Sequence, residues 1–405
     1  MNAVPRWLSI LGIGEDGVDG LSARAAKLIG EADLVVGGKR HLALVKPLIR
    51  NEIMPWPNPI RDALPAILAR RPGPVAVLAS GDPFSFGVGT LLAARVPADE
   101  FLCLPTPSAF SLACARLGWA MQDLSTISFC GRPIAALLPL LQTGTRVLAL
   151  SADATTAATV ADLLRARGFG ASRVIVLEAL GGPRERIRVA TADGFSLTDI
   201  DPLNMLAIEI IAGPDARVIP LCAGLDDASF EHDGQITKKE IRAMTLAALA
   251  PCRGDLLWDI GSGSGSVAIE FLLRHPSCRA IAFERVAERA ARAVRNAACL
   301  GVPGLRMVEG IAPRCLTGLP APDAVFIGGG AQQPGTIDSA WSALQPGGRM
   351  VVNAVTIETE AVLLEAVGRL GGTLTRLGVE RLDRIGSLHG FRPAMTVTQW
   401  VVRKP

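Results

Sequence analysis

The sequence Asp259-Ile260-Gly261-Ser262-Gly263-Ser264-Gly265-Ser266 decides the fold of the second half of the chain. It follows an apolar run, Leu256–Ile260, that predicts a buried strand, and it precedes a segment of helical period, Ser266–Arg274. Glycines at alternate positions let the backbone turn tightly and bring its N–H groups close to a ligand. A dinucleotide-binding loop of the pattern GxGxxG would need glycine at position 266, where serine stands. The spacing therefore argues against a nicotinamide cofactor.

An acid follows the next predicted strand, Ala280–Phe283. Glu284 lies about 20 residues beyond the glycines, where a carboxylate can accept hydrogen bonds from both hydroxyls of a ribose. Taken singly, the loop could be a Gly/Ser linker and Glu284 a solvated acid at a helix start. Both alternatives are disfavoured because strand, loop, helix, strand and acid follow one another along the sequence in the order of a nucleoside-binding unit. The pattern predicts a nucleoside site.

The spacing acid-x-GxGxG is similar to the first motif of class I methyltransferases, which use S-adenosylmethionine. Asp233–Arg242 resembles the entry helix of the cobalamin-pathway methyltransferases of the CbiT type, Val308–Pro313 their adenine-side loop, and Gln345–Arg349 the start of a later strand. Ile311 departs from that family, in which an acid is common at this place. The resemblance implies a cofactor site formed by Thr237, Gly261, Ser262, Gly263, Ser264, Gly265, Glu284 and Ala312.

The first half carries a glycine loop of its own, Leu11–Gly17, which matches GxGxxG after a strand. Glu15 and Asp16 would repel a pyrophosphate, and the strand Leu34–Val36 ends without an acid for the ribose. A nicotinamide oxidoreductase is therefore the least favoured alternative.

Two further loops of the first half, together with its glycine loop, form a pattern similar to that of a known family. Ala79–Gly87 carries Ser-Gly-Asp-Pro, which stops a strand abruptly, and Pro105–Ala109 follows along the chain. Together with the glycine loop they resemble the tetrapyrrole (class III) methyltransferases, and Phe129–Pro133 is similar to the CbiE branch, although Cys130 replaces its usual histidine. The resemblance implies that S-adenosylmethionine binds between two small lobes, at Gly12, Gly14, Ser80, Gly81, Asp82, Pro83, Ser108 and Ala109.

Apolar runs alternate with segments of helical period throughout, so the fold class is predicted as α/β. A polar, turn-rich stretch at 213–233 predicts a linker between two domains. We expect residues 1–212 to form a class III tetrapyrrole methyltransferase domain of two small α/β lobes, and residues 234–405 a class I, Rossmann-like methyltransferase domain. The predicted strands are Trp7–Leu11, Leu34–Val36, Val75–Ala79, Thr126–Phe129, Arg146–Leu150, Val174–Leu177, Met205–Ile211, Leu256–Ile260, Ala280–Phe283, Ala324–Ile327 and Arg349–Asn353. The predicted helices are Ser22–Gly30, Gly87–Ala94, Ser108–Arg116, Ala154–Arg167, Lys238–Leu249, Ser266–Arg274 and Ala287–Leu300.

Composition narrows the class of protein further. A net charge of +3 over 405 residues gives no support for nucleic-acid binding. Eight scattered cysteines without a CxxC pair favour free thiols in a reducing compartment, and the four histidines lack metal-ligand spacing, so no metal site is predicted. No apolar run has the length of a membrane helix or a signal peptide. We expect a soluble, cytoplasmic protein that binds no membrane.

The two resemblances together cover nearly the whole chain and imply one bifunctional enzyme of cobalamin biosynthesis with two S-adenosylmethionine sites. They imply methylation of carbons 5 and 15 of a tetrapyrrole and loss of carbon dioxide from the acetate on ring C, with the decarboxylation in the second half. Such modules are often oligomeric, so a homo-oligomer is expected by analogy. Methyl transfer from an activated donor needs orientation more than acid–base groups, so no catalytic residue is singled out.

The expected substrate is a small-molecule polycarboxylate, which arginine suits. The arginines that could bind it are Arg132, Arg242, Arg384 and Arg392, and for each a solvated surface charge is at least as good a reading. Two alternatives stay open at this point. The pair of sites could act on a different tetrapyrrole, or one half could be a degenerate binding module.

Overall fold

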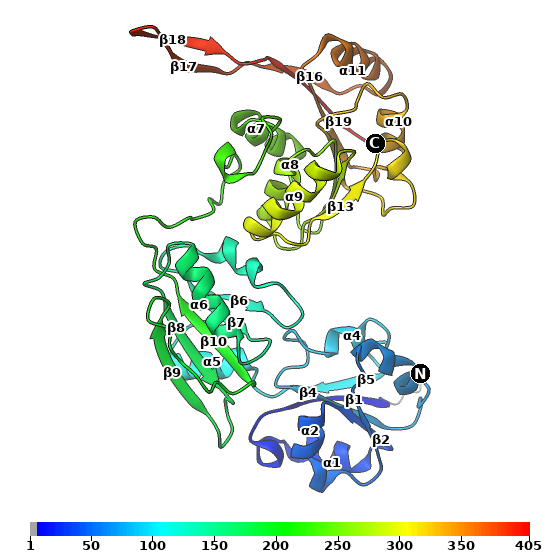
Figure 1. The fold of residues 1–405 in the computed structure, drawn as a ribbon. Helices are drawn as coiled ribbons and strands as arrows, with labels where there is room; N and C mark the ends of the chain where they lie inside the picture. The colour runs from blue at the N-terminus through cyan, green and yellow to red at the C-terminus, as the bar shows by residue number, and fades with distance from the viewer. Residues whose placement is uncertain (1–5) are drawn as a thin grey trace. The chain divides into compact units, whose positions relative to one another are not determined.

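The chain folds into two α/β units (Figure 1), and the computed structural model describes residues 6–405. The first unit takes the chain to Ile134 and again from Gln142 to Arg217; the second consists of Ala135–Leu141 and Val218–Pro405. No helix within residues 6–405 is long and apolar enough to cross a membrane. The α/β fold class is confirmed.

The first unit begins with a five-stranded parallel sheet in the order β3-β2-β4-β1-β5. Alternate residues of β1 face opposite sides, so Leu8 and Ile10 join one core and Leu11 and Ile13 the other. Both faces are covered, as parallel sheets require. The strands are β1 (Leu8–Ile13), β2 (Leu34–Gly37), β3 (Glu52–Pro55), β4 (Val75–Ser80) and β5 (Phe101–Leu104). The helices are α1 (Ala23–Glu31), α2 (Lys39–Leu44), α3 (Leu64–Leu68) and α4 (Gly89–Ala93).

A second, mostly antiparallel sheet completes this unit in the order β6-β7-β10-β8-β9. Helix α5 (Ala109–Leu117) packs Phe110 and Ala113 against one face, in a core with Leu148 and Ala207. The other helix is α6 (Thr156–Ala166). The strands are β6 (Ser125–Ser128), β7 (Arg146–Leu150), β8 (Arg173–Glu178), β9 (Arg186–Thr191) and β10 (Asn204–Glu209). The unit therefore has the two small α/β lobes expected.

The second unit is built on a seven-stranded sheet in the order β13-β12-β11-β14-β15-β19-β16. Its first five strands are parallel and β19 is antiparallel to both neighbours. The order reverses between β11 and β14, which makes the carboxyl ends of these strands the expected place for a ligand. The strands are β11 (Leu256–Ile260), β12 (Arg279–Glu284), β13 (Arg306–Glu309), β14 (Ala324–Ile327), β15 (Arg349–Ala354), β16 (Thr373–Leu377) and β19 (Val397–Arg403).

Helices cover both faces of this sheet (Figure 1). Ala340 of α10 and Leu363 of α11 are buried in a core with Trp258 and Trp400, while α7, α8 and α9 lie together on the opposite face. The helices are α7 (Lys239–Leu249), α8 (Ser266–Arg274), α9 (Ala287–Cys299), α10 (Thr336–Ala343) and α11 (Ile357–Leu370). This is the Rossmann-like arrangement predicted for the second half.

Several features of the second unit have no counterpart in the sequence predictions, among them α10, α11, β13, β16 and β19. Strands β17 (Glu380–Ile385) and β18 (Leu388–Pro393) form a separate hairpin that projects from the unit (Figure 1). Part of the predicted linker is packed rather than free, because Leu225 and Phe230 are buried. Residues 1–5 of the predicted first domain lie outside the described residues.

Candidate functional site

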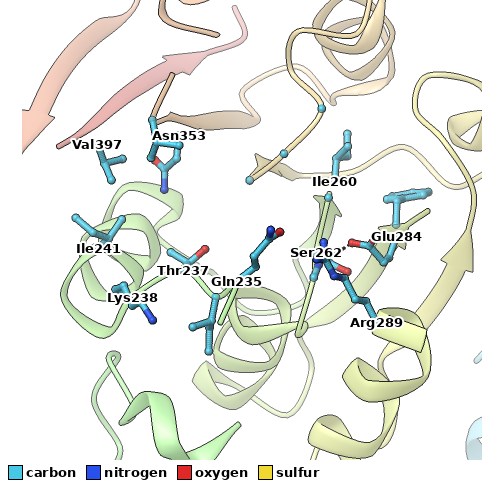
Figure 2. Close-up of a pocket in the computed structure, with 18 of the residues that line it drawn as sticks. Gln235, Thr237, Lys238, Ile241, Ile260, Ser262, Glu284, Arg289, Asn353 and Val397 are labelled. Atoms are coloured by element: carbon cyan, nitrogen blue, oxygen red, sulfur yellow. Dashed lines mark hydrogen bonds between the residues drawn. The ribbon is translucent and has the colours of Figure 1, made fainter. Parts of the chain in front are cut away.

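A cavity of about 730 Å³ lies at the carboxyl ends of the strands of the second unit (Figure 2). Its size falls within the usual range for small-molecule sites. Six of the eight residues predicted there from the resemblance line it: Thr237, Gly261, Ser262, Gly263, Glu284 and Ala312. The structure thus brings together residues that are spread along the sequence from position 237 to position 312.

The glycine loop forms the floor of this cavity because its backbone adopts conformations that favour glycine. Gly261 and Gly263 have φ values of +72° and +57°. A Cβ atom on Gly261 would lie 2.6 Å from the carbonyl oxygen of Gly329, so this position has no space for a side chain. Gly261 and Ser262 both donate their N–H to the oxygen of Phe283 at 3.0 Å, which ties the loop to β12.

Glu284 is held in a fixed orientation beside the loop. One carboxylate oxygen accepts the N–H of Gly263 at 2.9 Å and the other accepts the N–H of Val286 at 3.0 Å. Each oxygen keeps a further lone pair, so the carboxylate can accept two more hydrogen bonds, the number that the two hydroxyls of a ribose supply. The buried Ser262 hydroxyl also has no partner within the described residues. These hydrogen-bonding groups fit the nucleoside of S-adenosylmethionine.

Ser264 and Gly265 are placed differently from their prediction as cofactor ligands. Neither lines the cavity. The Ser264 carbonyl accepts a hydrogen bond from Nδ2 of Asn296 at 2.9 Å, and the Gly265 N–H donates to the carbonyl of Ser262 at 2.9 Å. A Cβ on Gly265 would lie 2.9 Å from that of Ala293. At this point the loop has turned into the packing of α8 against α9, so these two residues lie outside the cavity.

The opposite wall was not predicted from the sequence. It is formed by the ends of β14 and β15 and by the base of the β17–β18 hairpin, and it includes Gly328, Asn353, Val379, Arg381, Met395 and Val397. Neither of the two hairpin arginines predicted to bind substrate lines the cavity. Arg392 of β18 contacts Asp383 at 3.0 Å, and Arg384 lies on β17. Arg381 of the same strand lines it instead and pairs with Glu240.

Arg242 was also predicted to contact substrate, and its position contradicts this. Its side chain is fully buried, and each nitrogen of the guanidinium already donates to protein oxygens. Nε donates to Glu270, itself fully buried, at 2.5 Å. The guanidinium carbon also lies 4.7 Å from the ring centre of Phe230. Arg242 therefore anchors residues 225–230, and its fully buried side chain is not accessible to a substrate.

Replacing Arg242 with methionine is expected to destabilise the second unit by about 3–5 kcal/mol, because Glu270 would keep a buried charge without its partner. The free energy of unfolding in urea measures this. The exposed pair of Arg369 and Glu365 in the same unit supplies the control, since Glu365→Ala should leave that free energy nearly unchanged. An Arg242→Met protein as stable as the wild type would contradict a structural role.

Asp259, the acid before the glycines, is fully buried under the loop. One oxygen accepts the N–H of Ala268 at 3.0 Å, and the other has no partner among the described residues. Burial, aided by the nearby charge of Glu284 and opposed by the Ala268 hydrogen bond, raises the pKa of Asp259 to about 7. The carboxyl is therefore protonated well above the pH at which an ordinary aspartate ionises.

The raised pKa of Asp259 predicts a pH-dependent stability. Between about pH 4 and 7 the folded chain keeps a proton that the unfolded chain releases, so stability falls as pH rises through this window, by up to about 1.4 kcal/mol per pH unit, and levels off above it. Asp259→Asn removes this titration. We expect the variant to gain stability relative to wild type between pH 5 and pH 8 in urea unfolding; parallel curves for the two proteins would contradict the assignment.

In the first unit the three predicted loops meet. Gly81 donates to the carbonyl of Ile13 at 3.0 Å and accepts from the N–H of Thr106 at 3.1 Å. A Cβ on Gly12 would lie 1.9 Å from the Gly81 oxygen, and one on Gly81 would lie 2.9 Å from the Cα of Ser108. Gly12, Gly81 and Ser108 thus come from three separate segments into direct contact.

The other residues predicted for this site surround that contact. Asp82 accepts the N–H of Phe84 at 2.8 Å, the Pro83 carbonyl accepts the N–H of Gly89 at 2.8 Å, and Ser108 caps helix α5, which Ala109 begins. The Gly14 carbonyl accepts the N–H of Gly17 at 3.2 Å within the first loop. The Arg132 guanidinium carbon lies 5.3 Å from the ring centre of Phe86, which in turn packs on Phe110 of α5.

A polar cluster that was not predicted holds Ser80, the last residue of β4. Its hydroxyl lies 2.9 Å from Nε2 of His41 and 3.1 Å from a nitrogen of Arg40. Burial, with the charge of Arg40, lowers the pKa of His41 to about 4, so the imidazole is neutral at neutral pH. Arg40 also pairs with Glu15. Glu15 is therefore not the free negative charge that the sequence suggested.

Comparison with known proteins follows the same division of the chain. Residues 8–195 match the family described as Tetrapyrrole (Corrin/Porphyrin) Methylases, and residues 228–404 match the family described as Precorrin methyltransferase domain. A Sinorhizobium protein named precorrin-6Y C(5,15)-methyltransferase [decarboxylating] is 54% identical over 98% of this chain and 96% of its own length.

Two further relatives are informative. A Mycobacterium tuberculosis protein of the same name is 40% identical over 98% of this chain and 99% of its own length. A shorter Salmonella typhimurium protein, named cobalt-precorrin-6B C(15)-methyltransferase (decarboxylating), is 33% identical over 39% of this chain and 83% of its own length. The name of this shorter relative joins methylation at one carbon to decarboxylation.

Proposed function

Because this chain belongs to the family of the precorrin-6Y C(5,15)-methyltransferases (decarboxylating), we propose that it methylates carbons 5 and 15 of precorrin-6Y and decarboxylates the acetate on ring C, giving precorrin-8. The family relationship over nearly the whole chain carries this function, and the two sites described above are where we place its chemistry. Each methyl group comes from S-adenosylmethionine, which supplies it already activated on a sulfonium.

In the second unit we assign cofactor binding to Thr237, Gly261, Ser262, Gly263, Glu284 and Ala312. The oriented carboxylate of Glu284 and the close-approach backbone of Gly261 support this assignment. The protein's contribution is to orient the reacting carbon and to exclude water, because holding two reactants in line can supply about 7–11 kcal/mol. Preformed loops suit that task.

In the first unit we assign a second cofactor site to Gly12, Gly14, Ser80, Gly81, Asp82, Pro83, Ser108 and Ala109, and a substrate contact to Arg132. The direct contact of three loops at Gly12, Gly81 and Ser108 supports this site. We propose that this unit and the second unit each make one methyl transfer. Decarboxylation is assigned to the second unit, from its CbiT-like motifs and from the joint activity named for the Salmonella relative.

We place the boundary between the two domains within residues 213–233. The division of the fold at Arg217 and the family matches that end at 195 and begin at 228 support it. The cysteines of residues 6–405 form no disulfide, which agrees with the reducing cytoplasm that we propose as the location.

We also propose that the chain forms a homo-oligomer through its hairpin. An isolated two-stranded hairpin is marginally stable in water, and this one exposes Leu382, Leu388 and Phe391, by 61%, 72% and 67%. We expect Leu388→Asp combined with Phe391→Asp to shift the mass measured by sedimentation velocity to that of a monomer. An unchanged mass, or a monomeric wild type, would refute the proposal.

The proposed function is tested by measuring which groups the product has gained and lost. The full chain, incubated with precorrin-6Y and S-adenosylmethionine, should yield a product that has gained two methyl groups and lost one carbon dioxide, as mass spectrometry measures. Methyl transfer to a different tetrapyrrole with precorrin-6Y unchanged would favour the alternative substrate. A single methyl addition would favour one degenerate half.

A further inference from the structure

A chain of hydrogen bonds fixes the side chain of Asn353 at the end of β15. It begins at Thr245 of α7, whose hydroxyl donates to the carbonyl of Ile241 at 2.8 Å. Since a hydroxyl has a single proton, its oxygen can only accept from the two amides that approach it. These are Nδ2 of Asn353 at 3.0 Å and Nε2 of Gln399 at 3.3 Å.

Gln399 closes the chain. The second N–H of its amide donates to Oδ1 of Asn353 at 3.0 Å. Thr245 and Gln399 are buried, so a flipped amide would leave an unpaired polar group, at a cost of about 1–3 kcal/mol. Asn353 therefore cannot turn over. Its remaining N–H and one lone pair of its oxygen are left for a ligand in the cavity that it lines.

Apart from Thr245, Gln399 and Arg381, the residues around Asn353 are mostly apolar, and they lie away from the nucleoside end. Figure 2 shows Asn353, Val397 and Ile241 on one side of the cavity and Glu284 with Ser262 on the other. Val355 and Met395 line the cavity as well.

Three of the four cations that line the cavity are paired with carboxylates. Lys238 lies 3.8 Å from Asp227, Arg289 lies 2.8 Å from Asp233, and Arg381 pairs with Glu240. Arg285 directly follows Glu284 in the chain. A carboxylate placed against Asn353 would thus receive its direct hydrogen bond from a neutral donor, while Lys238, Arg289 and Arg381 of the same cavity are each already paired with an acid.

We propose that Asn353 binds the carboxylate that leaves as carbon dioxide, and that Thr245 and Gln399 are positioning residues that hold its amide. This inference rests on the proposed function. A neutral donor orients the carboxylate, while the apolar wall removes its water and raises its ground-state energy relative to the uncharged product.

The bond that breaks joins the carboxyl carbon to the methylene carbon of the acetate. Its electron pair passes into the conjugated macrocycle, carbon dioxide leaves, and the methylene carbon then takes a proton from water to become a methyl group. An arginine at the position of Asn353 would stabilise the carboxylate and oppose this step.

The test measures, in full-chain variants given precorrin-6Y and S-adenosylmethionine, the share of methylated product that has also lost carbon dioxide. For Asn353→Ala and Asn353→Asp we expect this share to fall about tenfold or more, because one hydrogen bond to a charged group is lost or replaced by repulsion. Thr245→Val leaves every side chain of the cavity wall in place and should give a smaller fall in the same direction.

Thr398→Val is the matched control, because it removes a buried hydroxyl of β19 that bonds to Glu360, and its share should equal that of wild type. The proposal is overturned if the decarboxylated share of Asn353→Ala stays at the wild-type value. If Asn353→Ala does not fold, the proposal is overturned if the share stays at the wild-type value in both Asn353→Asp and Thr245→Val. An equal loss of methylation and decarboxylation in a variant that still binds S-adenosylhomocysteine also overturns it. Failure of the proposed function is distinguishable, because the wild type itself would then leave precorrin-6Y unmethylated.

Discussion

Replacing Gly261 with valine is expected to abolish cofactor binding in the second unit while the first unit keeps its own. The residue has a φ of +72°, and a Cβ would lie 2.6 Å and 2.8 Å from the backbone oxygen and nitrogen of Gly329. Backbone atoms cannot move aside as a flexible side chain can, and the left-handed conformation alone costs about 1–3 kcal/mol for a non-glycine residue. Affinity for S-adenosylhomocysteine at this site should fall more than about a hundredfold, or about 2.8 kcal/mol.

Calorimetric titration of S-adenosylhomocysteine measures this loss, and product analysis should show one methyl addition missing. Gly304→Ala is the control, since a Cβ there meets no atom within 4 Å. If Gly261→Val retained both methyl additions, the class I site would be misplaced.

Gly12→Ala should produce the reciprocal loss in the first unit. Its Cβ would lie 1.9 Å from the Gly81 oxygen and 2.6 Å from the Thr106 nitrogen, at the point where the three loops meet. The loops must separate to admit it, so we expect the methyl addition of this unit to fall about a hundredfold or more, with the other retained.

Gly14→Ala is the matched comparison for Gly12→Ala in kinetic assays of each methyl transfer. Its Cβ meets only the side chain of Asp16, at 2.4 Å, and this side chain can turn away. A smaller loss is therefore expected. Equal effects of the two substitutions would show that the contact of the three loops does not control the site.

Much of the fold could be predicted where a local pattern is strong. Strands Leu256–Ile260 and Ala324–Ile327 and helix Ser266–Arg274 have the predicted bounds, because each is apolar or periodic and ends at a turn residue. Strands β17 and β18 were missed because nearly all of their residues are exposed and their sequences contain no apolar run that would predict a strand. Strand β3 was missed for the same reason.

The residues of the candidate site also fall into those that local sequence spacing predicts and those that it does not. Gly261 and Glu284 lie within one strand–loop–helix–strand unit, so their spacing alone predicted them. Asn353 reaches the same cavity only because β15 is two strands from β11 in the sheet, which local spacing does not reveal. Arg242 was misassigned because its burial depends on Glu270 of the next helix.

The central claim is that each unit binds its own S-adenosylmethionine, and the number of sites tests it most directly. Isothermal titration of S-adenosylhomocysteine into the full wild-type chain should give two sites per chain, and into Gly261→Val or Gly12→Ala one site each. A single site in the wild type, lost completely in one variant and unaffected in the other, would contradict the account.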